Sequence, residues 1–303
     1  KECNEAAQYL DERQSPTDKN GAVKVTKGFA WSVAGKALLF AGDYADAKTA
    51  LAKVINSKKY ELVPGNRFGE LFHIEGDGDE EKVFESNIVY SSSIGSWSGL
   101  IQRSTWMQAN IWTWRTDKLA AKPTVCGVDG WGGLAVSKSF GDDMLANDGD
   151  SYRRKATFLT PDEFLYEIGW PDDATVTTLD SKKVDKSRGI SSTTGLYGLC
   201  GYFPYKRLVS KSDVAGPGGW SEANFLIMRY AEVLLMYAEA CTQAGDADGT
   251  GLKALNAVQT RAGSKHVSTS LTLSEVKNEK RFEMWLEGCR FVDMVRWGDA
   301  ESS

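Results

Sequence analysis

Small residues at regular intervals constrain the fold of this chain more than any other feature of its sequence. The pattern of small and apolar side chains predicts one helix over Thr26–Gly42 and a second over Asp43–Lys59. Gly35 and Ala47 stand where two antiparallel helices approach too closely for larger side chains. Gly42 supplies the stop between the helices. The two helices are therefore expected to pack against each other as a hairpin.

This arrangement of small residues matches the tetratricopeptide repeat, a helix pair that stacks on further copies of itself. A second copy is predicted at Ala231–Ala262, where Ala238 and Gly245 take the roles of Gly35 and Gly42. The two copies predict a mainly α-helical fold built on a tetratricopeptide-like repeat scaffold.

The middle of the chain has a different composition. Glycine, serine, tryptophan and tyrosine become dense between residues 65 and 221, and helical periodicity fades. Only a short strand at Glu85–Ser91 and a helix at Val136–Asn147 are predicted there. We therefore expect one domain over residues 1–303. Its helical scaffold spans residues 1–64 and 222–297, and an irregular, loop-rich ligand-binding insertion with little β structure spans residues 65–221.

The C-terminal part predicts two long helices. The first covers Asn224–Gly245 and carries a narrow polar stripe. The second begins after Ser274 as N-cap, runs through Val276–Glu287, and continues or restarts beyond Gly288 to Trp297. Charged residues follow one another on it at steps of three or four, which predicts a ladder of contacts along one helix: Lys280, Glu283, Glu287, Arg290, Asp293 and Arg296. Such stripes and ladders are typical of structural faces.

Composition excludes several classes of function. A net charge of -5 and a pI near 5.3 argue against nucleic-acid binding, which depends on neutralising phosphates. The 5 cysteines are scattered without a C-x-x-C pair, and 2 histidines leave little material for a nucleophilic triad. The loop after Asp246 imitates a calcium loop but has Ala257 where a glutamate ligand is required. The sequence therefore predicts no cofactor, no metal and no catalytic residue.

Three long runs in the C-terminal part closely resemble the SusD/RagB family: Arg229–Ala240, Asn256–Gly263 and Glu279–Gly298. The resemblance extends upstream to Gly28–Trp31, Tyr60–Leu62 and Asp150–Phe158, and so covers nearly the whole chain. It implies a non-catalytic binding protein that captures glycans, or in some members peptides, for uptake through a partner SusC-like TonB-dependent transporter.

The resemblance also implies a location, the extracellular face of the cell outer membrane of Bacteroidota, with attachment by an N-terminal lipid. The family's N-terminal part with its lipidated cysteine lies outside this chain, as does the stretch that usually follows the Arg-Trp-Gly motif. Cys3 lies well inside the matched region and is not expected to be the lipidation site.

The ligand is expected at the tryptophans of the middle region, because indole rings stack on the apolar faces of sugars. Family members commonly bind through this stretch. The candidates are Trp97, Trp106, Trp112, Trp114 and Trp131, with Arg103, Gln108 and Asn110 as polar partners. By contrast Trp31, Trp285 and Trp297 lie in helical patterns and are expected to be structural.

Two other functions remain open from the residues alone. An α-helical glycoside hydrolase would also combine tryptophans with carboxylates, which Asp129, Asp142 and Asp143 would supply. A repeat scaffold that binds a protein partner on its concave face is the other alternative.

Overall fold

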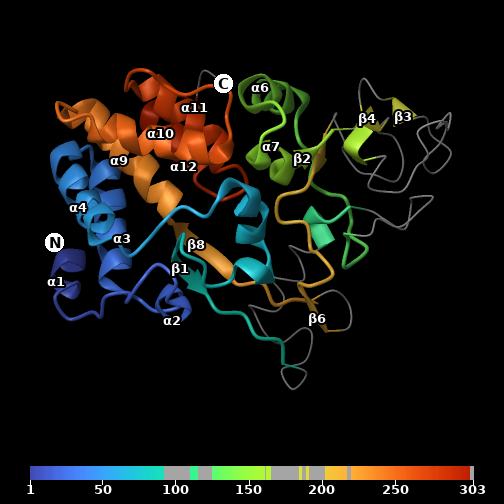
Figure 1. Cartoon of the computed structure of the whole chain (residues 1–303), viewed down its shortest axis with the longest axis horizontal. Helices are drawn as coiled ribbons and strands as arrows, with labels where there is room; N and C mark the ends of the chain where they lie inside the picture. Colours follow the sequence, from blue (N-terminus) through green and yellow to red (C-terminus); the bar gives the residue numbers. More distant parts are fainter. Residues whose placement is uncertain are drawn as a thin grey trace. The chain divides into compact units, whose positions relative to one another are not determined.

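The computed structural model describes residues 1–91, 110–114, 125–160, 162–164, 184–185, 189–190, 202–216 and 220–300 (Figure 1). The chain divides into two compact units. The helical unit comprises Lys1–Phe68, Asp77–Ser86 and Phe225–Ser303, and the loop unit comprises Gly69–Gly76 and Asn87–Asn224. Residues 1–64 and 225–297 of the predicted scaffold lie in the helical unit, whereas residues 222–224 lie in the loop unit. Residues 65–68 and 77–86 of the predicted insertion lie in the helical unit as well.

The helical unit contains most of the regular structure. Its elements are α1 (Glu2–Ala6), α2 (Lys19–Ala22), α3 (Lys27–Ala41), α4 (Tyr44–Ser57), β1 (Lys82–Ser86), β8 (Phe225–Arg229), α9 (Tyr230–Ala244), α10 (Thr250–Ala262), α11 (Leu273–Glu283) and α12 (Arg290–Trp297). A 3-10 helix, η1 (Gly65–Phe72), leads from this unit into the loop unit.

The loop unit is mostly irregular where the structure describes it. It contains η2 (Ile74–Gly76), α6 (Lys138–Asp148), α7 (Tyr152–Thr157), β2 (Phe158–Leu159), β3 (Val184–Asp185), β4 (Gly189–Ile190), β5 (Phe203–Pro204), β6 (Val214–Gly216) and β7 (Trp220–Ser221). The described strands of both units form only two-stranded antiparallel sheets, β1–β8, β2–β5, β3–β4 and β6–β7. The prediction of a mainly α-helical fold with little β structure is confirmed.

The first predicted helix pair is present as α3 and α4. The Thr26 hydroxyl caps α3, Gly42 ends it with a φ of 80°, and the Asp43 carboxylate caps α4. A Cβ on Gly35 would lie 2.5 Å from Cγ of Leu51, so only glycine lets the two helices approach this closely. The small-residue pattern therefore identified a real crossing.

The second pair is present as α9 and α10, but its close contact lies elsewhere. Ala238 is fully buried as expected. The tight crossing is at Gly251, where a Cβ would lie 2.5 Å from Cβ of Cys241. The Asp246 carboxylate accepts hydrogen bonds from the amides of Gly251 and Leu252, at 2.6 and 3.0 Å, and so caps α10.

The predicted helix over Asn224–Gly245 was wrong at its start. Residues 225–229 form β8, because their side chains alternate between exposed and buried positions with the period of a strand rather than a helix. Its antiparallel partner is β1, with Lys82 opposite Arg229 and Ser86 opposite Phe225. The strand expected at Glu85–Ser91 lies earlier, at Lys82–Ser86, and overlaps the predicted range only at Glu85 and Ser86.

The last helical region restarts after Gly288, which is one of the two alternatives that the sequence left open. Thr272, not Ser274, caps α11, and the helix ends at Glu283. Leu286 and Gly288 then take left-handed backbone conformations, with φ of 62° and 81°, before α12 begins at Arg290. The predicted charge ladder therefore does not run along one helix. None of the helices in the described ranges is long and apolar enough to cross a membrane.

The charged residues of the ladder pair with residues of other elements. Two of them, Glu283 and Glu287, pair with Arg229. Its guanidinium, which is fully buried, contacts the carboxylates of Glu81 at 2.8 Å, Glu283 at 2.6 Å and Glu287 at 2.7 Å. Arg261 from α10 binds Glu81 at 2.6 Å and also pairs with Glu283. Burial by itself lowers the pKa of Arg229, but the three glutamates raise it well above its usual value. We call these five residues the Arg229 cluster.

Further buried ion pairs join the other helices. Lys280 of α11 contacts Asp293 of α12 at 2.7 Å, and Lys36 of α3 contacts Glu232 of α9 at 2.7 Å. Glu239 of α9 accepts from Arg296 and from the indole nitrogen of Trp297 at 2.7 Å. The stripe and the ladder are therefore structural faces, as the sequence indicated, although they act between helices.

Replacing Arg229 by methionine tests how much the Arg229 cluster stabilises the helical unit. The variant keeps a long apolar stem but removes the positive charge that faces three buried carboxylates. Breaking a buried ion pair in this way costs about 3–5 kcal/mol. We expect the free energy of unfolding, measured by urea denaturation and far-UV circular dichroism, to fall by about that amount.

The control is Lys138→Met. Lys138 pairs with Asp142 at 2.6 Å, but both side chains are about half exposed. Its loss should change the free energy of unfolding by less than about 0.5 kcal/mol. Equal losses in the two variants would contradict a special role for the buried cluster.

Candidate ligand-binding site

Two neighbouring arginines, Arg153 and Arg154, stabilise the part of the loop unit that contains α6 and α7. Ser137 caps α6, which begins at Lys138 rather than at Val136, and Ser151 caps α7. Arg153 binds Asp148 through two hydrogen bonds of 2.8 and 2.9 Å, and both side chains are fully buried. The acidic and basic residues around Gly149 therefore stabilise the connection between α6 and α7.

Arg154 extends this framework toward the next segment. Its guanidinium contacts Glu163 at 2.6 and 2.8 Å and Asp150 at 2.8 Å. Glu163 also accepts from the amide of Thr160 at 2.9 Å. Phe164 follows directly and is fully buried, so the arginine fixes the position of an aromatic core residue.

Trp114, one of the predicted ligand-binding residues, lies in this aromatic core. Its ring packs edge-on against Phe164 at 4.9 Å and stacks with Tyr205 at 6.1 Å. Its indole nitrogen donates to the carbonyl of Pro204 at 2.7 Å, and the residue is 2% exposed. Its ring therefore offers no open face to a ligand in this structure.

Backbone hydrogen bonds join the segment around Trp114 to the loop that carries Trp131. The amide of Gly130 donates to the Trp114 carbonyl at 2.9 Å, Trp131 to Asn110 at 2.5 Å, and Gly132 to Thr113 at 3.1 Å. A Cβ on Gly130 would lie 2.1 Å from the Thr113 carbonyl oxygen, so this approach requires glycine. We call this contact between residues 110–114 and 130–132 the glycine clasp.

A third segment supports the same loop from its other end. Gly127 donates its amide to the Val209 carbonyl at 2.9 Å, and Cys126 forms a β-bridge with Ser210. Val209 in turn donates its amide to the Thr113 hydroxyl at 3.3 Å. Residues 110–114, 126–132 and 209–210 are therefore joined mainly through main-chain groups, with the Thr113 hydroxyl as the side-chain contribution.

The predicted ligand-binding side chains on these segments differ in their exposure to solvent. Trp131 is 43% exposed, the largest indole surface among the predicted residues that the structure describes. Trp112 is half-buried, and the Arg207 guanidinium lies over its ring at 5.3 Å. Asn110 is buried and contributes its carbonyl to the glycine clasp. The predicted Trp97, Arg103, Trp106 and Gln108 lie outside the described residues.

Arg207 was not anticipated from the sequence. It follows Trp112 by almost a hundred positions, so no local pattern connects the two, and its positive φ of 64° is not readable from the residue type. Its guanidinium also lies over Phe72 at 5.5 Å. Cation–π contacts of this kind orient a ring while leaving its other face available.

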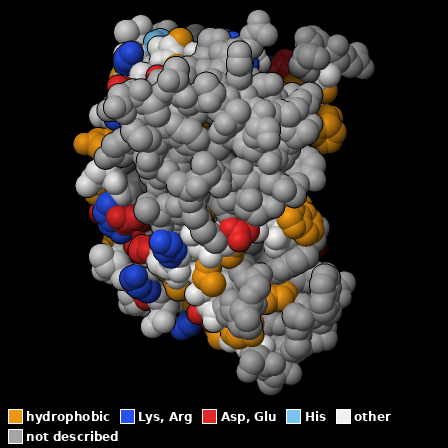
Figure 2. All heavy atoms as spheres, turned by 90° about the vertical axis from the view of Figure 1, so that its right-hand side faces the viewer, with side chains coloured by type: hydrophobic (Ala, Val, Ile, Leu, Met, Phe, Trp, Pro, Cys, Tyr) orange, Lys and Arg blue, Asp and Glu red, His pale blue; other side chains and the backbone are white. Residues whose placement is uncertain are grey.

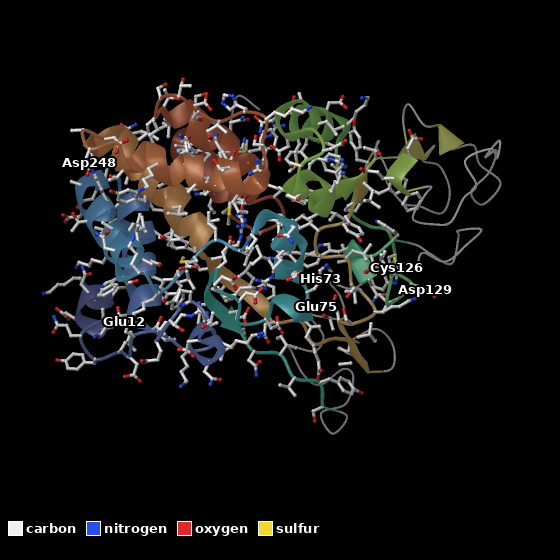
Figure 3. The ribbon with its side chains drawn as sticks, in the orientation of Figure 1. Glu12, His73, Glu75, Cys126, Asp129 and Asp248 are labelled. Carbon is white, nitrogen blue, oxygen red and sulfur yellow. The ribbon has the colours of Figure 1, made fainter. Side chains whose placement is uncertain are left out.

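The carboxylates considered for glycoside hydrolysis have other surroundings. Asp142 pairs with Lys138 at 2.6 Å and accepts from the Tyr202 hydroxyl at 2.5 Å, and these contacts lower its pKa. Asp143 lies on the same helix, and Asp129 lies exposed in the loop before Trp131, near Cys126 (Figure 3). Asp142 is thus held as a surface ion pair.

Charge on the visible surface is mixed. Figure 2 shows acidic and basic side chains beside one another on the described part of that face, without a broad field of one sign. The described residues contain no group of three or more histidine, cysteine, aspartate or glutamate side chains that could hold a metal ion.

Comparison with known proteins places these features in a family context. The sequence profile of the SusD family matches residues 107–303. A SusD-like protein of Bacteroides ovatus is 35% identical over 111 residues, which cover 32% of this chain and 20% of that protein.

Solved structures share the fold at lower sequence identity. A laminarin-binding SusD-like protein superposes with a TM-score of 0.74 at 24% identity, over 99% of this chain and 60% of its own. Surface glycan-binding protein A of Bacteroides thetaiotaomicron, in complex with laminarihexaose, gives 0.72 at 24% identity over the same shares. The counterpart from Bacteroides uniformis gives 0.68 at 21% identity, over 98% and 56%. The chain therefore spans about 60% of the length of the first two.

The structure predicts that two tryptophans of the same segment have different roles in stability. Trp114→Ala empties a site in the aromatic core and should lower the free energy of unfolding by about 3–5 kcal/mol. Trp131→Ala removes a ring that is nearly half exposed and should cost about 1 kcal/mol or less. Urea denaturation followed by far-UV circular dichroism measures both, and the reverse order would contradict the assignment of Trp114 to the core.

Proposed function

We propose a function for this chain from two facts: it belongs to the SusD family, and its loop unit holds an exposed indole on a loop fixed by main-chain hydrogen bonds. The function is the capture of a glycan, an oligo- or polysaccharide, without chemical conversion. The observation that carries the proposal is the exposure of Trp131 at the glycine clasp.

The physical basis is the match between an indole face and a sugar ring. The C–H bonds on one face of a pyranose are apolar, and an aromatic ring covers them, while the hydroxyls at the rim remain free for polar groups. Trp131 offers such a face, and its loop is held by the amides of Gly130 and Gly132. A platform that is already ordered loses little conformational entropy when the ligand binds.

The comparisons support a glycan rather than another ligand. Proteins of the same fold are described as laminarin-binding and as bound to laminarihexaose. We include Trp112 as the second aromatic of the platform, because it lies in the same clasp and its ring is oriented by Arg207. Trp97, Trp106, Arg103, Gln108 and Asn110 remain candidates from the sequence.

We further propose that the protein acts at the extracellular face of the cell outer membrane, anchored by an N-terminal lipid and working with a SusC-like TonB-dependent transporter. The support is family membership. Lys138 and the Tyr202 hydroxyl lower the pKa of Asp142, so this carboxyl is poorly suited to act as the general acid of a glycoside hydrolase. A peptide ligand is the alternative within the family, and the ligand panel below distinguishes it.

Calorimetric titration with laminarihexaose, other neutral oligosaccharides and a set of peptides tests the ligand class. We expect a neutral glycan to bind, and Trp131→Ala to weaken its affinity by about tenfold or more, the equivalent of about 1.4 kcal/mol. Trp131→Phe keeps an aromatic face and should retain part of the affinity. Tyr152→Ala removes another exposed aromatic of the loop unit, 58% exposed on α7, and should leave affinity unchanged.

Three outcomes would count against the proposal. Binding of peptides alone would assign the chain to the other ligand class. Equal affinity of wild type and Trp131→Ala would contradict the role of Trp131 as the binding platform. Release of reducing sugar ends during prolonged incubation would show that the protein is an enzyme.

The location is tested on intact cells that express the full-length protein. We expect added protease to degrade it without cell lysis, and we expect it to co-purify with an outer-membrane transporter after mild detergent extraction. A periplasmic marker is the control for cell integrity. Protection of the protein in intact cells would contradict a position on the extracellular face.

A further inference from the structure

A groove of about 570 Å³ lies in the loop unit, between the short helices η1 and η2 and the segment around residues 205–212. Glu70 of η1, Glu75 of η2 and His73 between the two helices line it, and Figure 3 shows His73 and Glu75 close together. Tyr205 and Lys211 line it from the other segment. Its volume is within the range of small-molecule sites.

A buried carboxylate fixes the orientation of His73 in this groove. Nδ1 of the imidazole lies 2.8 Å from Oδ2 of Asp213, whose side chain is 2% exposed. The same carboxylate accepts from the amides of Ile74, at 2.9 Å, and Ser210, at 2.8 Å, and from the Ser210 hydroxyl at 2.9 Å. The Ile74 and Ser210 contacts hold the carboxylate in place, and the imidazole can rotate away only by breaking its own contact with that carboxylate.

This network decides which nitrogen of His73 carries the proton. Burial by itself raises the pKa of Asp213, but the hydrogen bonds from His73, Ile74 and Ser210 lower it below its usual value, so the carboxylate is ionised. An ionised carboxylate only accepts hydrogen bonds. Nδ1 must therefore donate, and in the neutral ring Nε2 is an acceptor.

The chemistry of the groove is thus dominated by acceptors. Nε2 of His73, in the neutral ring, and the carboxylates of Glu70 and Glu75 accept hydrogen bonds. Within the described part of the chain Glu75 makes no ion pair, and the exposed Lys211 is the one cation that lines the groove. A ligand that donates several hydrogen bonds and carries no negative charge fits this surface, because the glutamates and Asp213 disfavour an anion.

We infer that this groove is a second glycan subsite, separate from the Trp131 platform, which accepts an uncharged, hydroxyl-rich sugar residue through Nε2 of His73 and the carboxylate of Glu75. The inference rests on the proposed function and names its ligand class, a neutral rather than an acidic glycan. Hydroxyl groups of the sugar donate hydrogen bonds to these two acceptors.

The first test uses the small number of histidines. The sequence has 2, so a protein labelled with 15N-histidine gives resonances of His73 and His266 alone, and the variant His266→Gln assigns them. We expect the free protein to show the tautomer of His73 with the proton on Nδ1. Titration with laminarihexaose should shift Nε2 of His73, because a hydroxyl then donates to it, and leave His266 unchanged.

The second test measures affinity. Glu75→Gln keeps the shape of the side chain but removes its charge and one acceptor oxygen, and we expect the affinity for laminarihexaose to fall at least fivefold. The matched control is Glu275→Gln, since Glu275 pairs with His266 at 2.8 Å on an exposed surface of the helical unit. A hexameric oligogalacturonate, as an acidic probe, should bind at least tenfold more weakly than laminarihexaose.

The outcomes separate this inference from the proposed function. Loss of binding in Trp131→Ala, with Glu75→Gln and the His73 resonances unaffected by ligand, overturns the second subsite and leaves the platform standing. Binding of the acidic hexamer as tightly as the neutral one overturns the ligand class. Binding of no oligosaccharide overturns the proposed function and this inference together.

Discussion

The helical unit depends on a fully buried arginine whose charge is balanced by three glutamates. Arg229 sits where β8 passes into α9, Glu81 immediately precedes β1, and Glu283 and Glu287 end and follow α11. Each element contributes a charge that would be costly inside the protein alone and is stabilised only when the others are in place. The Phe68 ring beside Arg229 and Arg261, at 5.8 and 4.9 Å, encloses the cluster. Ion pairing thereby specifies which elements meet, while the apolar residues of α4, α9 and α10 supply the core.

The loop unit holds an aromatic ring exposed to water although it contains little regular structure. Main-chain hydrogen bonds among three segments fix the loop, and glycines at 127 and 130 allow backbones to approach where a Cβ would collide. Trp131 is partly exposed on this loop, whereas Trp114, with its buried hydrogen bond to Pro204, belongs to the aromatic core.

The sequence predicted the fold better than the site, for identifiable reasons. Gly35 and Gly42 act within one helix pair, so their spacing is a local signal, and the structure confirmed both roles. The strand at Phe225–Arg229 was missed because its apolar run of four residues, next to a helix, carries no helical or strand period of its own. The charges of the ladder pair mainly between helices because the chain turns between α11 and α12, where Leu286 adopts a left-handed conformation that its residue type does not indicate. At the site, the order of exposure among Trp112, Trp114 and Trp131 depends on partners far along the chain, such as Arg207 and Phe164, which no local pattern reveals.

The Arg229 cluster has a consequence for how the helical unit comes to be folded. Arg229 pairs with a glutamate 148 positions before it and with another 58 positions after it, so the cluster joins distant parts of the chain. As the polypeptide is synthesised, β1 and α9 emerge before the carboxylates that follow, and the arginine then has only Glu81 as a partner from the finished cluster. The hairpin of α3 and α4 can form from local contacts, but closure of the unit has to wait for α11. The Arg229 cluster is therefore completed, and the native arrangement of the helical unit stabilised, only when α11 and the residues after it are in place.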